Sequence, residues 1–128
     1  MSNKVSEDTD KTIGIVAYVT LIGFIIAAVM NNDKKGDEKS FGAFHLRQSL
    51  GIIIAAIGTM IGLAILTAIL AAISWSLGAT VAGILYPLMY LGILAFVIIG
   101  IINASNGEKK PLPLIGPFIE KILKSTFE

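Results

Sequence analysis

Three long apolar runs separated by short polar segments set the pattern of this chain. The run 50–73 contains no charged side chain. As a helix with a rise of about 1.5 Å per residue, it would be roughly 36 Å long, enough to cross a hydrocarbon core of about 30 Å. The pattern therefore predicts an all-α integral membrane protein, a single membrane domain over 1–128, with three transmembrane helices over about 12–30, 49–73 and 79–102.

The polar segments predict how the chain meets the membrane surface. Residues 31–48 form a charged loop that ends in FGAFHLRQ. We interpret this end as the headgroup-level start of the second span, with its aromatic rings at the interface and Arg47 reaching toward lipid phosphates or water. Residues 111–128 open with a proline-rich turn and predict a short helix from Pro117, apolar on one face and charged on the other. Because that helix is too short to span, we expect a C-terminal interfacial amphipathic helix that lies on lipid or docks on the bundle.

The distribution of lysine and arginine predicts the orientation. Most of the ten basic residues lie in two segments that three spans would place on the same side. They are Lys34, Lys35, Lys39, Arg47, Lys109, Lys110, Lys121 and Lys124. The positive-inside rule then puts the loop 31–48 and the C-terminus in the cytoplasm and the N-terminus outside. The acidic stretch within residues 1–11 is unlike a secretory signal peptide, so we expect a multi-pass protein of a bacterial inner membrane that keeps its first span.

A stripe of small residues marks the second span. Gly51, Ala55, Gly58 and Gly62 recur every three or four positions, and the last two form a GxxxG pattern. This spacing puts them on one helix face, where another backbone can approach closely. It favours a helix crossing within the subunit or between subunits, although glycine is also common in membrane helices for other reasons.

The third span carries two tyrosines and a proline near its middle, Tyr86, Pro87 and Tyr90. The proline removes a backbone hydrogen bond and is expected to kink the helix. The two tyrosine hydroxyls lie one turn apart at membrane depth, where they need partners or a wet cavity. Two interpretations stay open: a kinked helix with tyrosines bonded to nearby backbone, or the lining of a pore.

One polar cluster is a candidate site. His45, Arg47 and Gln48 precede the second span, and Lys109 and Lys110 follow the third on the same predicted side. Such a cluster could bind an anionic lipid headgroup or the acidic segment of a partner. It could equally be an ordinary cytoplasmic flank of the spans.

The residue content argues against catalysis, metal binding and ion-coupled transport. The chain has no cysteine and one histidine, and no charged residue lies inside a predicted span. Thiolate or multi-histidine metal sites and ion-coupled transport are therefore disfavoured. The net charge of +1, with basic residues scattered among acidic ones, also disfavours nucleic acid as a partner. We expect no enzymatic activity and no cofactor.

Two motifs carry a family resemblance. FHLRQSLG at 44–51 and PLPLIGPFIEKI at 111–122 resemble the bacterial relatives of the chloroplast inner-envelope import component Tic20, a group of small membrane proteins that also includes membrane proteins of magnetosomes. In that family a His is followed, after one residue, by Lys or Arg, then Gln and Ala. His45, Arg47 and Gln48 match, whereas Ser49 departs. The resemblance implies a helical membrane protein associated with protein import or with the assembly of membrane complexes.

Together these features favour a non-enzymatic accessory or scaffold subunit of a membrane protein complex, with a link to protein translocation. Its partners would be membrane lipids and other membrane proteins or copies of itself. The alternative is an oligomeric channel or translocation pore. Because three spans cannot enclose an aqueous channel, that alternative requires several copies or another subunit.

Overall fold

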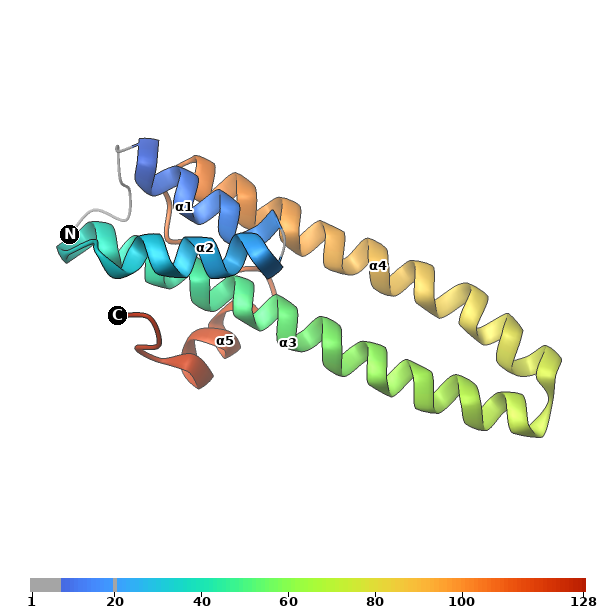
Figure 1. Ribbon diagram of the computed structural model, residues 1–128. Coiled ribbons are helices and arrows are strands. Elements are labelled where there is room, and N and C mark those ends of the chain that lie inside the picture. The colour runs from blue at the N-terminus through green and yellow to red at the C-terminus, as the bar shows by residue number, and fades with distance from the viewer. Residues whose placement is uncertain (1–7, 20) are drawn as a thin grey trace.

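The computed structural model describes residues 8–19 and 21–128, and these residues form helices and short connections. The helices are α1 (Asp8–Val19), α2 (Leu21–Asn32), α3 (Gly36–Ile73), α4 (Trp75–Ser105) and α5 (Gly116–Leu123). Helices α3 and α4 form a long antiparallel hairpin, and α1, α2 and α5 gather around one end of it (Figure 1). The predicted all-α class is confirmed for the described residues.

The long hairpin supplies two candidate spans. Helix α3 has 38 residues and α4 has 31, which correspond to about 57 Å and about 46 Å. Their most apolar stretches are only 6% and 11% buried within the protein, unlike the core helices of a soluble domain. A tight turn at Ser74 joins them, where its hydroxyl accepts a hydrogen bond from the backbone of Leu77. Because α3 is longer than the hydrocarbon core is thick, its first part must extend beyond the membrane.

The first predicted span folds differently from the expectation. Helices α1 and α2 have 12 residues each, about 18 Å, and neither is long enough to cross a bilayer. They lie antiparallel, side by side against the end of the α3–α4 hairpin (Figure 1). The prediction of one continuous span over 12–30 is therefore wrong, and a count of three spans is not confirmed.

The reason for this fold-back is that apolar side chains on one face of α1 and α2 cover protein. Ile13, Phe24 and Ala27 are buried in one cluster with Leu46 of α3. The ring of Tyr18 packs directly on Gly100 of α4. A larger residue would not fit there, because a Cβ at this position would overlap the ring. An apolar run of this length can be buried either in a bilayer or against a protein surface. Tertiary packing decides which of the two the chain adopts.

The fold-back also changes the predicted orientation. Lys34, just after α2, forms an ion pair of 2.9 Å with Asp10 near the start of α1. The start of α1 therefore lies at the same end as the loop before α3, which does not support the predicted outer N-terminus. That prediction required three spans. Residues 1–7 lie outside the described part of the chain.

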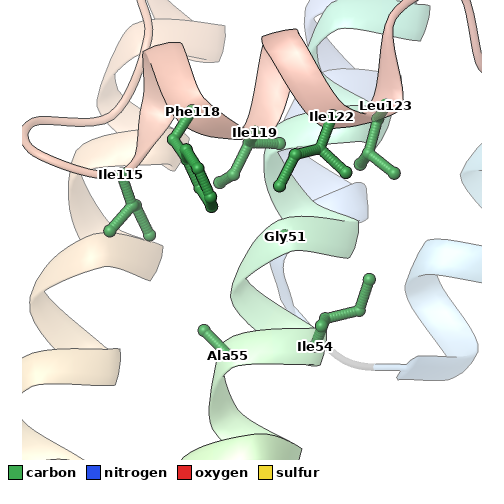
Figure 2. A pocket seen from close by; sticks show the side chains of 8 residues that line it. All are labelled: Gly51, Ile54, Ala55, Ile115, Phe118, Ile119, Ile122 and Leu123. Atoms are coloured by element: carbon green, nitrogen blue, oxygen red, sulfur yellow. The ribbon is translucent and has the colours of Figure 1, made fainter.

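Helix α5 has the predicted amphipathic character, with Pro117 in its first turn. It crosses α3 with its apolar side chains pointing along α3 toward the uncharged stretch (Figure 2). Its carboxylate, Glu120, instead bonds to polar side chains of α3. The predicted alternative that this helix docks on the bundle is therefore observed.

Candidate functional site

A buried polar cluster lies where α3 meets the C-terminal segment. We call it the polar junction and define it as Tyr18, His45, Arg47, Gln48 and Glu120. Its α3 members lie within 41–49, a stretch that is buried throughout because α1, α2, α4 and the C-terminal segment surround it. This stretch was predicted to start the second span at headgroup level with its aromatic rings at the interface, but its side chains are buried in protein.

His45 has both ring nitrogens occupied. Its Nε2 donates to the backbone carbonyl of Glu108 at 2.7 Å, and the hydroxyl of Tyr18 donates to Nδ1 at 2.8 Å. The carbonyl can only accept, so Nε2 carries a proton, and Nδ1 of the uncharged ring is left to accept from Tyr18. The rings of Tyr18, Phe41 and Phe44 stand edge-on to the imidazole at 4.7–5.7 Å between centroids. His45 is therefore a fixed structural group in this arrangement.

The electrostatics of His45 follow from its burial. Removal from water disfavours the imidazolium and lowers the pKa of His45 from 6.5 to about 4. The hydrogen bond to the Glu108 carbonyl opposes this shift, and the nearby charge of Lys109 adds to it. The ring is consequently uncharged near neutral pH.

Gln48 fixes the turn that leads into α5. Its Oε1 accepts from the backbone N–H of Leu112 at 3.0 Å. Its Nε2 donates to the carbonyl of Gly116 at 3.1 Å and to Oε2 of Glu120 at 2.9 Å. A Cβ at Gly116 would overlap the backbone of Pro111 and crowd the Gln48 oxygen, so this position has room only for glycine. One amide thus sets where the C-terminal segment reverses direction.

Arg47 carries the charge of the polar junction. Its Nε and Nη2 bind Oε1 of Glu120 at 2.9 Å and 2.8 Å. Its Nη1 donates to the carbonyl of Thr126 at 3.2 Å and to Glu128 at 3.3 Å. The Arg47 side chain is only 5% exposed, so it does not reach lipid phosphates as the sequence predicted. A buried guanidinium without these partners would be strongly destabilising.

The two lysines of the predicted cluster lie at its margin. Lys109 donates to the hydroxyl of Ser40 at 2.6 Å. Lys110 is exposed, and its carbonyl accepts from the side chain of Asn103 at 3.2 Å. The five candidate residues are therefore brought to the same end of the molecule, but His45, Arg47 and Gln48 face protein instead of a common ligand.

The small-residue stripe on α3 divides into two parts. A Cβ at Gly51 would overlap Ile119, so this glycine gives α5 room to cross, and Ala55 lines the space below the crossing. Gly58 and Gly62 face open space. The close approach of α3 to α4 instead occurs at Gly78, where a Cβ would meet the backbone of Ala71.

The tyrosines of α4 do not converge on a shared polar space within the subunit. The helix continues through Pro87, which is exposed. Tyr86 is half-buried beside small residues of α3, whereas Tyr90 is 57% exposed on the outer surface. The geometry of one subunit gives no specific support to a pore lined by this pair.

Sequence reasoning missed two members of the polar junction. Tyr18 lies in an apolar run, where its hydroxyl was the one signal of a polar partner. Glu120 lies opposite the apolar face of α5 and is the one acidic residue of that helix, and Glu128 beyond the helix also pairs with Arg47. In the described residues, no group of three or more His, Cys, Asp or Glu side chains could hold a metal ion.

A long apolar hairpin with a buried polar junction at one end defines a small helical membrane protein. Over residues 9–119 the chain matches the family model described as the magnetosome magnetite crystal formation protein family. Because this match covers most of the chain, the protein belongs to that family. Neither a comparison with curated proteins nor one with solved structures found a match.

This family membership corrects the resemblance drawn from the two motifs. The assignment to relatives of Tic20 is wrong, because the chain matches the magnetosome family model instead. The link to protein translocation depended on that assignment and loses its basis. The motif residues themselves lie within the matched range, apart from the last few positions of α5.

Proposed function

We propose that this protein is a non-enzymatic structural component of the magnetosome membrane that supports magnetite crystal formation by organising lipids or other membrane proteins. Family membership supplies the process. The observation that carries the structural role is the polar junction, whose polar side chains bind one another and the backbone. In this role Arg47 and Gln48 shape the protein instead of acting on a substrate.

The surfaces available to partners support this role. Large apolar side chains cover the outside of the hairpin, such as Ile65 at 57% and Leu91 at 63% exposed. The outer face of α2 adds Ile25 at 54% and Val29 at 66%. Surfaces of this composition contact lipid tails or other membrane helices.

We place the polar-junction end on the cytoplasmic side. None of the ten lysines and arginines lies within 49–102, and the nine in the described part of the chain flank the hairpin on the side opposite its turn. The turn itself, at Ser74, carries no charge. The positive-inside rule favours the cytoplasm for the basic end.

The test is complementation in a magnetite-forming bacterium from which this gene has been deleted. Crystal number and size, measured by electron microscopy, should change on deletion and return with the wild-type gene. His45→Gln should also restore the crystals, because glutamine keeps a donor for the Glu108 carbonyl. Arg47→Leu, which releases α5, should not restore them at equal membrane abundance.

The same experiment can contradict the proposal. If His45→Gln is present in the membrane and folded but restores nothing, a chemical role for the imidazole would replace the structural one. If deletion leaves crystal number and size unchanged, the protein has no organising role in crystal formation.

A further inference from the structure

An apolar groove lies in the corner between α5 and α3. Helix α5 crosses α3 at Gly51, and Phe118 and Ile122 point from α5 toward Ile54 and Ala55 (Figure 2). The groove has a volume of about 310 Å³, at the lower end of the range for small-ligand pockets, about 300–1,000 Å³. Every residue that lines it is apolar.

The groove lies next to the uncharged, membrane-spanning stretch of α3. Arg47 and Gln48 are the last strongly polar side chains before the uncharged stretch of α3, and Gly51 follows within one turn. The groove therefore begins at the depth where hydrocarbon begins. Phe118 and Ile122 are 63% and 59% exposed, so one wall opens toward the bilayer.

Lysine side chains near the groove favour a lipid with an anionic headgroup. The carboxylate of Glu120 is paired with Arg47 and is directed into the protein. Lys121 on the same short helix and Lys124, the residue directly after it, are exposed. Each lysine is next in sequence to a residue that lines the groove, Ile122 or Leu123, and long lysine side chains reach headgroups from such positions.

We propose that this groove binds one acyl chain of an anionic phospholipid, with the headgroup phosphate held by Lys121 and Lys124. The binding does not depend on a role in magnetite formation, because the groove, the depth and the charge are properties of this chain alone. It makes α5 a lipid-dependent part of the fold.

The test uses the full-length chain in vesicles, with tryptophan as the reporter. Replacement of Trp75 by Phe gives a background without indole, into which Phe118→Trp puts a reporter at the groove. Ile98→Trp is the matched control, because Ile98 is exposed on α4. It lies at a similar depth to the groove, since Phe96, two residues away, lines a cavity together with Ala55. Quenching is measured with phosphatidylglycerol or phosphatidylcholine carrying brominated chains.

Brominated phosphatidylglycerol should quench the Phe118→Trp reporter several-fold more efficiently than brominated phosphatidylcholine at equal mole fraction. The Ile98→Trp reporter should show no such preference. Lys121→Gln with Lys124→Gln should remove the headgroup preference, and Ala55→Phe, which fills the groove, should lower quenching by both lipids. Ala72→Phe, on an exposed face near the far end of α3, should change neither.

Two results would overturn the proposal. Equal quenching of both reporters by both lipids would mean ordinary contact with bulk lipid. Protection of the Phe118→Trp reporter from every brominated lipid, together with crosslinked dimers, would mean that a second copy of this chain covers the groove. Neither result bears on the crystal phenotype of the deletion strain, so the lipid site and the proposed function fail separately.

Discussion

At the polar-junction end, α3 contacts four other helices, whereas over its far half it lies against α4 alone (Figure 1). In the first region the residues 41–49 are buried and their polar side chains have specific partners. In the second, apolar side chains such as Ile65 are largely exposed. Lipid tails are as apolar as leucine, so exposure to them carries little penalty and gives little drive to fold. Specific tertiary structure in this protein is therefore concentrated at one end, and lipid completes the other.

The largest loss of stability is expected when the positive charge of the polar junction is removed, since this end of the protein holds the specific tertiary contacts. Arg47→Leu should lower the free energy of unfolding by about 3–5 kcal/mol, because the carboxylate of Glu120 loses its charged partner in a partly buried site and keeps only the amide of Gln48. SDS titration in mild-detergent micelles measures this loss, and protease cleavage within 111–128 should rise with it. The double variant Arg47→Leu with Glu120→Leu should recover much of the stability. An Arg47→Leu variant as stable as wild type would contradict the assignment.

A pH titration tests the buried histidine. The pKa of His45 is lowered from 6.5 to about 4 in the folded protein, so between these values the unfolded chain binds more protons. Stability should be full above pH 6.5 and fall as the pH drops toward 4, by up to about 3 kcal/mol. His45→Gln should flatten this part of the curve, and the difference between the two proteins removes the contribution of carboxylates. Parallel curves would show that His45 is not held neutral.

Two glycines of α4, one in contact with another helix and one in open space, allow the stability of the two regions to be compared. Gly100→Ala should destabilise by about 1–3 kcal/mol, because the added methyl displaces the Tyr18 ring from its place beside His45. Gly92→Ala, on the same helix but in open space, should be neutral or stabilising by up to about 1 kcal/mol. Equal effects in SDS titration would mean that α1 does not pack on α4 here.

The smallest effect is expected in the far half of the hairpin. Ile65→Ala should change the free energy of unfolding by no more than about 0.5 kcal/mol, because this side chain is 57% exposed and contacts lipid in either case. Leu46→Ala, fully buried at the other end, is the matched comparison and should lose about 2–5 kcal/mol. A large loss from Ile65→Ala would indicate a contact between copies on that face.

Sequence patterns predicted the apolar parts of α3 and α4, and α5, because each depends on local information. The predicted loop 31–48 is wrong from Gly36 onward, where α3 begins. An uncharged run of more than twenty residues or an amphipathic face needs no distant partner to be recognised. The fold-back of 12–30 could not be predicted this way. It depends on Tyr18 meeting His45, 27 positions further along the chain.

The candidate site shows the same limit. His45, Arg47 and Gln48 were singled out as a group because they precede the second span, and all three lie in the polar junction. Their role was not predictable, since the partner Glu120 lies 73 positions beyond Arg47. Without that pairing, an arginine next to a span is most simply interpreted as contacting headgroups.

The unbroken course of α3 has a mechanical consequence. One helix, Gly36–Ile73, runs from the crowded end to the turn at Ser74 without interruption. A continuous helix tilts as one body, so a change in tilt at Arg47 is also a change in tilt at Ile73, and the turn at Ser74 moves with the polar junction.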